Sequence, residues 1–277
     1  MKVPELIKKE AMALLVRVFE NREASAMIRA LEEDLFGTSP LEWTPDTAAG
    51  WKSAIDRILD GEPLAYITGF SHFLNFKLRI NPHVLIPRPE TEELAVMAIN
   101  YLKNIKQPCL LDIGTGSGCL ALAIKSACPG ATVFALDIDS AALETARTNA
   151  DAYHLNIDFM QVDFLDENVW AGLPGNLNLI ISNPPYIGET EKNIMSASTL
   201  KHEPRHALFA GIDPLIFYRQ MARFGKDHLI EGGRIMVEIN EYRGKETANV
   251  FREAGYPNIE IYRDLSGKER IVVVSSQ

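Results

Sequence analysis

The sequence contains no long apolar segment. Its 277 residues include no run near the roughly 20 apolar residues that a membrane-spanning helix needs. The first 20 residues place Lys and Glu among apolar positions, which is typical of an amphipathic helix and differs from a secretory signal peptide. The apolar share of 47% and charged share of 23% are ordinary for a globular protein. We therefore expect a globular chain with a sizeable core and no membrane association.

Cysteine is scarce, and its three positions, Cys109, Cys119 and Cys128, form no CxxC pair. The six histidines are scattered along the chain. Thiolate and imidazole metal sites need their ligands at close, regular spacings, so we expect no metal site. An odd number of cysteines among apolar or small neighbours favours buried free thiols and a cytoplasmic location.

Positive charge is also in deficit, because 28 Lys and Arg face 37 Asp and Glu, for a net charge of −9. Proteins that hold nucleic acid usually present a basic surface to the phosphates. The charge balance therefore disfavours nucleic acid as a direct partner, although a local basic cleft is compatible with it.

The chain divides into three parts by pattern. Apolar residues at 3–4 spacing predict helices over 1–19, 22–36 and 46–60. The segment 73–80 alternates like a half-buried strand, and 81–90 is stiffened by prolines. We predict a small all-helical N-terminal domain over 1–60, a connector with short strands over 61–90, and an α/β domain over 91–277.

Strands and helices alternate through the third part. The expected strands cover 109–114, 132–137, 156–163, 177–182, 234–240, 258–264 and 269–276. The expected helices cover 90–104, 117–128, 140–153, 214–229 and 243–255. Alternation of this kind predicts a mostly parallel sheet with helices on both faces.

A glycine turn, Asp112-Ile113-Gly114-Thr115-Gly116-Ser117-Gly118, joins the first of these strands to its helix. Glycines allow a tight turn and a close approach by a ligand. The dinucleotide fingerprint GxGxxG would need glycine at 119, where Cys119 stands, so NAD is disfavoured. No GK[ST] follows, which excludes a P-loop. A tight turn without a ligand remains an alternative.

The next two strand ends carry acids. Asp137 lies 23 residues after Gly114, where a carboxylate can accept both ribose hydroxyls, whereas Asp139 is expected to cap the following helix. Asp163 and Phe164 follow the third strand and suit an adenine amino group and ring, or else a loop acid and a core aromatic. Together these features suit a nucleoside ligand without a polyphosphate, such as S-adenosylmethionine.

The fourth strand ends in Asn183-Pro184-Pro185-Tyr186. Each proline fixes its own φ and keeps the residue before it extended. The Asn183 side-chain oxygen and the Pro184 carbonyl can then accept the two hydrogens of a planar amino group, with Tyr186 against its face. The alternative is a proline-stiffened turn that is capped by asparagine.

With this tetrapeptide the chain resembles the methyltransferases that act on planar nitrogens. More narrowly it resembles the PrmC/HemK family, the protein-(glutamine N5) methyltransferases that modify peptide-chain release factors. The matching segments are GEPLAYITG, VLIPRPETEEL, LDIGTGSGCLALA, ALDID, ISNPPYI, EPRHALFAGIDPL and DLSGKER. Pro214 and Asn240 stand where the family usually has glycine, which puts the geometry of two loops in question.

The resemblance implies a Rossmann-like domain with a seven-stranded, mostly parallel sheet that binds S-adenosylmethionine and releases S-adenosylhomocysteine. It implies a substrate glutamine in the Gly-Gly-Gln tripeptide of class I release factors. The implied cofactor residues are Gly114, Thr115, Gly116, Ser117, Gly118, Asp137, Asp163, Phe164 and Asn183. The implied substrate residues are Asn183, Pro184, Pro185 and Tyr186, with Asn183, Pro184 and Tyr186 catalytic.

Two connector segments also belong to the family pattern. Phe73 and Phe76 could wall the pocket or pack as core aromatics. Arg88 and Glu90 could position the cofactor loop or the glutamine, or form a structural bridge between loops.

Three other functions stay open at this point. A nucleic-acid methyltransferase can carry the same tetrapeptide, but it would need a flipped base and a basic surface. A glutamine methyltransferase of a ribosomal protein and a binding module with an inactive site are the others. We expect a monomer whose helical domain docks the release factor.

Overall fold

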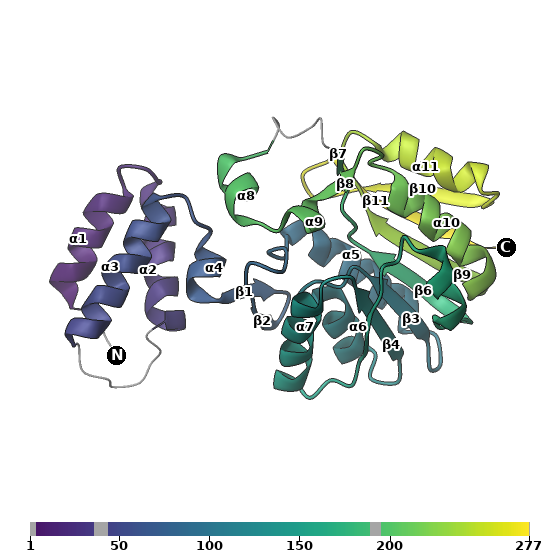
Figure 1. Ribbon diagram of the computed structural model, residues 1–277, viewed down its shortest axis with the longest axis horizontal. Helices are drawn as coiled ribbons and strands as arrows, with labels where there is room; N and C mark the ends of the chain where they lie inside the picture. The colour runs from purple at the N-terminus through teal and green to yellow at the C-terminus, as the bar shows by residue number, and fades with distance from the viewer. Residues whose placement is uncertain (1–3, 36–43, 189–194, 277) are drawn as a thin grey trace.

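The computed structural model describes residues 4–35, 44–188 and 195–276. Three antiparallel helices stand at one end of the molecule, apart from the α/β domain (Figure 1). They are α1 (Glu5–Leu15), α2 (Asn21–Leu35) and α3 (Pro45–Leu59). The helix predicted over 22–36 is thus α2, with Phe36 outside the described residues.

The helices bury a core of their own that includes Leu15, Leu31, Trp51 and Ile58. The short helix α4 (Leu64–Thr68) adds Ile67 to this core, so apolar contacts of the helical domain reach past residue 60. The domain boundary near residue 60 stays a prediction.

The segment predicted as one strand over 73–80 is instead a hairpin. β1 (Phe70–Phe73) and β2 (Phe76–Arg79) pair antiparallel, and Leu74 in the turn has a φ of 50°. This left-handed conformation is unusual for leucine, and here the Leu74 N–H donates to Glu92 Oε1 at 2.6 Å. The single-strand prediction was wrong because alternation does not reveal a turn that a distant carboxylate stabilises.

The α/β domain holds the predicted seven-stranded sheet, in the order β10-β11-β9-β6-β3-β4-β5. Its strands are β3 (Cys109–Ile113), β4 (Thr132–Asp137), β5 (Asp158–Gln161), β6 (Leu177–Ser182), β9 (Leu229–Glu238), β10 (Asn258–Arg263) and β11 (Glu269–Ser275). β11 runs antiparallel to both of its neighbours, and the other pairs are parallel. The predicted fold class is confirmed.

Successive residues of each strand face opposite sides of the sheet, so the side chains of one strand pack into two cores, one on each face. Leu110 packs in the core beneath α5 (Pro89–Leu102), α6 (Cys119–Ala127) and α7 (Ser140–Ala152). Leu111 packs in the core beneath α10 (Ile216–His228) and α11 (Gly244–Glu253). Burial on both faces explains why the central strands are continuous apolar runs.

Between β6 and α10 the chain forms smaller elements that cover the carboxyl edge of the sheet. They are β7 (Ile187–Gly188), α8 (Ala197–His202), α9 (Arg205–Leu208) and β8 (Phe209–Gly211), and β7 pairs with β8. A 3₁₀ helix over Glu167–Gly172 precedes β6. These elements were not predicted from the sequence.

No described helix combines the length and the apolar character that a membrane span requires. The three cysteines are free thiols, with Cys128 buried and Cys109 and Cys119 partly exposed. Burial was therefore predicted correctly only for Cys128. Among the residues described, no group of three His, Cys, Asp or Glu side chains could hold a metal ion.

Candidate active site

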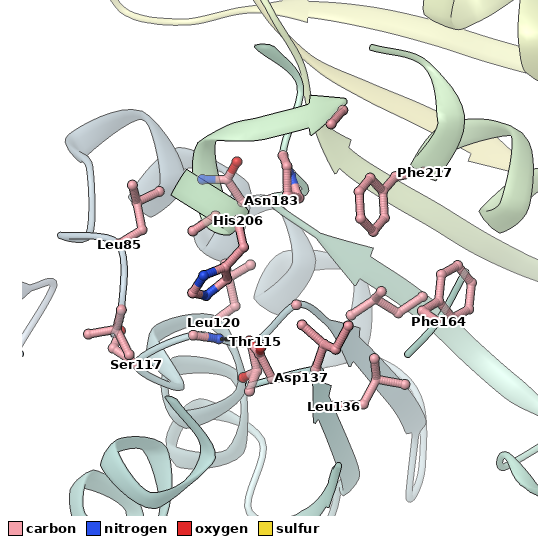
Figure 2. Close-up of a pocket in the computed structure, with 18 of the residues that line it drawn as sticks. Leu85, Thr115, Ser117, Leu120, Leu136, Asp137, Phe164, Asn183, His206 and Phe217 are labelled. Carbon is pink, nitrogen blue, oxygen red and sulfur yellow. Dashed lines mark hydrogen bonds between the residues drawn. The ribbon is translucent and has the colours of Figure 1, made fainter. Parts of the chain in front are cut away.

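A cavity of about 350 Å³ opens at the carboxyl edge of the sheet. The glycine turn, the end of β4, the segment after β5 and the segment after β6 all line it, because parallel strands end at the same edge. In Figure 2, Asn183 lies across the opening from Asp137, with Phe217 and Phe164 to one side.

The glycine turn keeps the backbone close to the cavity. Gly114, Gly116 and Gly118 have φ values of 71°, 54° and 82°, which favour glycine. A Cβ at Gly118 would lie 2.7 Å from Leu122 Cδ1 and 3.2 Å from Ala146 Cβ. Gly118 is therefore needed for the packing of α6 against α7 as well as for its φ.

Thr115 and Ser117 line the cavity between these glycines and are almost fully buried. The Thr115 hydroxyl donates to Asp112 Oδ2 at 2.7 Å behind the turn. Asp112 is fully buried, and burial raises the pKa of its carboxyl to about 7. The Ser117 carbonyl accepts from Asn149 Nδ2 at 2.9 Å, which ties the turn to α7.

Asp137 lies at the end of β4, in the cavity wall. Its Oδ2 accepts from the Gly116 N–H at 2.9 Å and its Oδ1 from the Asp139 N–H at 3.0 Å. Burial raises the pKa of this carboxyl, and both oxygens can still accept further hydrogen bonds. Asp139 caps α7 by accepting from the Ala141 N–H at 2.8 Å, as expected.

Phe164 lines the cavity and also belongs to the core. Its ring stacks on Trp170 at 5.6 Å and meets Phe224 edge-on at 5.4 Å. Asp163 lines the cavity beside it, and its Oδ1 accepts from the Leu165 N–H at 3.0 Å. The two interpretations of Phe164 are compatible, since a core ring can present one edge to a ligand.

Asn183 follows β6 directly, and both Asn183 and Pro185 line the cavity. Asn183 Nδ2 donates to the Thr91 hydroxyl at 3.1 Å, and that hydroxyl donates to Glu238 Oε2 at 2.7 Å. Pro184 is buried and Tyr186 is partly buried, and neither residue lines the cavity. The substrate and catalytic roles of Pro184 and Tyr186 stay predictions.

Glu238 also receives the Tyr186 hydroxyl, at 3.4 Å from Oε1. Neither Thr91 nor Glu238 was predicted from the sequence. The available signal was weak, namely an acid that closes the apolar strand RIMVEIN and a threonine in the first turn of α5.

The connector candidates separate into two groups. Arg88 lines the cavity, and its Nη2 donates to the buried Glu203 at 2.5 Å, which is the bridge between loops. Glu90 does not line the cavity. Phe73 is fully buried and Phe76 nearly so, both in the core beneath α5, so the interpretation that they wall the pocket was wrong. They point inward because the hairpin turns at Leu74.

Asn240, one of the two departures from the family pattern, adopts no left-handed backbone. Its side chain accepts from the Tyr242 N–H at 3.0 Å. Pro214 follows Asp213, whose Oδ1 accepts from the Leu215 N–H at 2.9 Å. The turn at Asn240 is therefore closed by the Asn240 side chain itself. The turn at Pro214 is closed by the side chain of the preceding Asp213.

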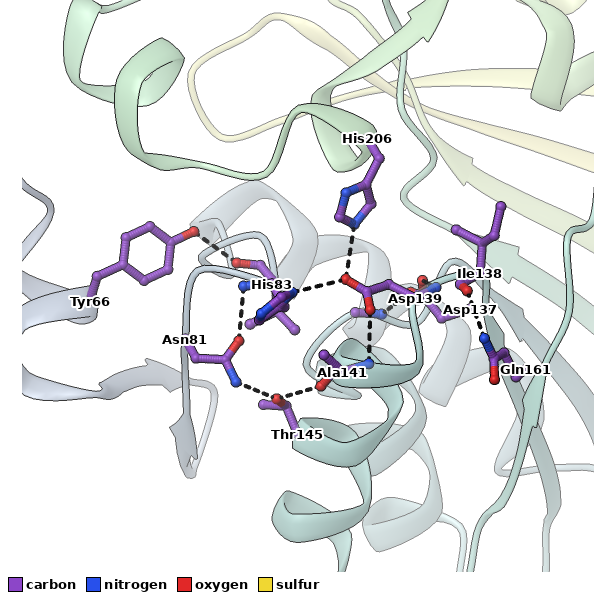
Figure 3. Close-up of polar contacts among 12 residues, drawn as sticks. Tyr66, Asn81, His83, Asp137, Ile138, Asp139, Ala141, Thr145, Gln161 and His206 are labelled. Carbon is purple, nitrogen blue, oxygen red and sulfur yellow. Dashed lines mark hydrogen bonds and ion pairs between the residues drawn. The ribbon is translucent and has the colours of Figure 1, made fainter.

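Two histidines that the sequence analysis missed meet Asp139 at the edge of the cavity. His83 Nδ1 lies 3.2 Å and His206 Nε2 lies 3.7 Å from Asp139 Oδ2 (Figure 3). Both histidines line the cavity, one from the connector and one from α9. Through these two contacts, the connector and α9 are both joined to the start of α7, from either side of the cavity opening.

Comparison with known proteins places this geometry among methyltransferases. Residues 95–216 match the family described as the methyltransferase small domain. The release factor glutamine methyltransferase of Bacteroides thetaiotaomicron is 38% identical over 226 residues, which cover 81% of this chain and 80% of that protein. The protein of the same name from Flavobacterium psychrophilum is 35% identical over 232 residues, covering 81% and 79%.

Among solved structures, the T. thermophilus 16S rRNA N2 G1207 methyltransferase, in complex with AdoMet and guanosine, is 16% identical. The match covers 75% of this chain and 50% of that one, with a TM-score of 0.53. This likeness shows a shared fold. The family identification rests on the curated relatives, whose matches cover 79–81% of both chains. On that ground, the chain belongs to the family of release factor glutamine methyltransferases.

Proposed function

We propose that this protein transfers a methyl group from S-adenosylmethionine to the side-chain amide nitrogen of a glutamine, that of the Gly-Gly-Gln tripeptide in class I release factors. The observation that carries the proposal is the hydrogen-bonding state of Asn183. Its Nδ2 is engaged by Thr91, which leaves Oδ1 as an acceptor for an amide hydrogen at the cavity.

The cavity suits the cofactor. Its volume of about 350 Å³ lies within the range of about 300–1,000 Å³ usual for small-molecule sites. Asp137 offers acceptors to ribose hydroxyls and would repel a phosphate, and the glycine turn leaves room for close approach. Asp163 and Phe164 offer an acceptor and an apolar edge to the adenine. When bound, the cofactor supplies an electrophilic methyl group on a sulfonium.

The protein's own part is to position and polarise the glutamine amide. An amide nitrogen is a poor nucleophile, because its lone pair is delocalised into the carbonyl. Hydrogen bonds accepted by Asn183 Oδ1 and the Pro184 carbonyl would orient the nitrogen and stabilise the positive charge that develops there. Neither group is basic, so the surplus proton on the methylated nitrogen leaves to water after transfer.

A glutamine side chain is too small to identify its protein, so selectivity needs a wider surface. The helical domain contributes no strand to the seven-stranded sheet. Two of its aliphatic residues are largely exposed, with exposed fractions of 69% for Leu6 and 63% for Val18. We expect the release factor to dock there, over an area on the order of 1,200–2,000 Å². We expect a monomer, and a cytoplasmic location because release factors act in the cytoplasm.

The test is methyl transfer from labelled S-adenosylmethionine to purified class I release factors. The wild-type tripeptide should be labelled, and a tripeptide with its glutamine substituted should not. A short Gly-Gly-Gln peptide should be a poor substrate, because it lacks the remote contacts that position the amide. Labelling of DNA or RNA in place of the release factor would overturn the proposal.

A further inference from the structure

Glu238 is a carboxylate with 1% exposure that lies directly behind the candidate acceptor site. We propose that Glu238 is a positioning residue: through Thr91 it fixes the Asn183 amide with Oδ1 toward the substrate, and through the Tyr186 hydroxyl it holds the other end of the tetrapeptide. This inference rests on the proposed function and adds to it the group that sets the orientation of its acceptor.

The fold brings these groups together at the ends of two neighbouring strands. β6 and β9 are parallel, and Ser182 pairs with Val237. Asn183 follows Ser182 directly, and Glu238 follows Val237 as the last residue of β9, so the two lie at the same level of the sheet edge. Thr91, in the first turn of α5, stands between their side chains.

The number of hydrogens decides the direction of each bond. A carboxylate only accepts, so the single Thr91 hydroxyl hydrogen goes to Glu238 Oε2. The Thr91 oxygen then has only lone pairs for Asn183, and it accepts from Nδ2. A flipped Asn183 would bring Oδ1 against those lone pairs. The ionised Glu238 therefore selects the amide orientation that presents an oxygen to the cavity.

The strand end that carries Glu238 is held on its other side. The Tyr218 hydroxyl from α10 donates to the Glu238 backbone carbonyl at 2.9 Å. Because the same residue is bonded to α5, α10 and the segment after β6, its carboxylate has little freedom to move.

The charged residues that act on Glu238 come from β11 and α5. Arg270 on β11 favours its ionised form, although Arg270 is itself paired with Asp264 at 3.1 Å. Glu90 on α5 disfavours the ionised form, and the hydroxyls of Thr91 and Tyr186 favour it. Burial is the largest effect and raises the pKa of Glu238 to about 7. Below this pH a protonated Glu238 can donate to Thr91, and the direction of both bonds is no longer imposed.

The first experiment removes the relay hydroxyl. Thr91→Val keeps the shape of the side chain and should lower kcat for release-factor methylation about tenfold, the usual effect of one hydrogen bond. Cofactor affinity should stay close to wild type, Tm should fall because the buried Glu238 carboxylate loses a donor, and Thr91→Ser should restore both kcat and Tm. The matched control is Thr247→Val, since Thr247 is fully buried on α11 and its hydroxyl has no partner among the described residues. Wild-type kcat in Thr91→Val would overturn the proposal.

The second experiment follows the titration. Wild-type kcat should rise with pH through about 7. Glu238→Gln, whose amide can donate to Thr91 as the protonated acid can, should lose that rise and stay near the low-pH rate of the wild type at every pH. A rise that persists in Glu238→Gln would assign it to another group and overturn the role of Glu238.

A readout without substrate separates this inference from the proposed function. The side-chain amide ¹H–¹⁵N resonances of Asn183 should shift with pH through about 7 in the wild type and stay fixed in Glu238→Gln and Thr91→Val. If the wild type methylates no release factor but the resonances behave this way, the proposed function fails and the hydrogen-bond relay stands. If the resonances do not respond to pH or to either substitution, the relay is wrong whatever the activity.

Discussion

The two ends of the cavity are built in different ways. The cofactor end is local, because the glycine turn and Asp137 lie within one strand–helix–strand unit and are joined by the Gly116–Asp137 hydrogen bond. The acceptor end is assembled from α5, the segment after β6 and the end of β9, through bonds that span up to 147 residues. A ligand site can thus be encoded by one motif at one end and by the topology of the sheet at the other.

The largest effect is expected from Asn183→Ala at the acceptor end. Loss of one preorganised polar group at a reacting centre should lower methylation by about 10²–10³-fold. Cofactor affinity, measured by calorimetry, should change little because the cofactor end is built separately. Full turnover by this variant would remove Asn183 from the mechanism, and a large loss of cofactor binding would show that the two ends are not independent.

Asp137→Ala tests the cofactor end in the same way. The binding free energy of S-adenosylmethionine should weaken by roughly 1–3 kcal/mol, the cost of leaving polar partners unpaired. At saturating cofactor the methylation rate should recover most of its wild-type value. Unchanged affinity in calorimetry would remove Asp137 from the ribose role.

Each end also contains a buried carboxyl whose pKa burial raises to about 7, Asp112 behind the glycine turn and Glu238 behind Asn183. A carboxyl whose pKa is higher in the folded state binds its proton more tightly there. Between about pH 4.5 and 7 the folded protein therefore holds more protons than the unfolded chain, and the free energy of unfolding falls as pH rises.

We expect each carboxyl to contribute on the order of 1–3 kcal/mol to this fall. Urea unfolding at pH 5 and pH 7.5 measures it, with Asp112→Asn and Glu238→Gln each flattening part of the dependence. If one substitution alone removed the whole pH dependence of the free energy of unfolding, only one end of the cavity would hold a carboxyl that changes its charge in this pH range.

The helical domain lies outside both ends of the cavity. Substitutions in it should therefore change neither the cofactor end nor the acceptor end. Leu6→Glu and Val18→Glu place charge on its two most exposed aliphatic positions. We expect KM for an intact release factor to rise about tenfold, as when an apolar contact is lost from an interface. Cofactor affinity should remain that of the wild type. An unchanged KM in both variants would move recognition to the α/β domain.

The smallest effect is expected from His206→Ala at the edge of the cavity. His206 and Asp139 are partly exposed and 3.7 Å apart, and such pairs contribute about 0–1 kcal/mol. Cofactor affinity should weaken by less than about fivefold. His83→Ala is the comparison, because His83 meets the same Asp139 oxygen from the connector. A loss as large as that of Asp137→Ala would show that the histidines contact the ligand.

Much of the cofactor end could be predicted because its constraints act over a few residues. Glycine positions, prolines and the last residue of a strand are visible in sequence, as are the alternation of strands and helices and the extended Asn183-Pro184-Pro185 backbone. The failures had a longer-range origin. The hairpin at Leu74 and the inward direction of Phe73 depend on a turn that Glu92 stabilises from α5.

The fold class, the glycine turn with Asp137, and the contiguous tetrapeptide Asn183 to Tyr186 follow from the order of residues alone, since neighbouring residues set backbone conformation and periodicity. Only the tertiary structure decided the partners that hold the site: Thr91 and Glu238 behind Asn183, Glu203 beside Arg88, and the two histidines on Asp139. The physical reason is that these side chains lie far apart in the chain and meet only once packing has fixed the order of the strands. Their hydrogen bonds are short-ranged, so no local pattern records them before β6 and β9 lie side by side.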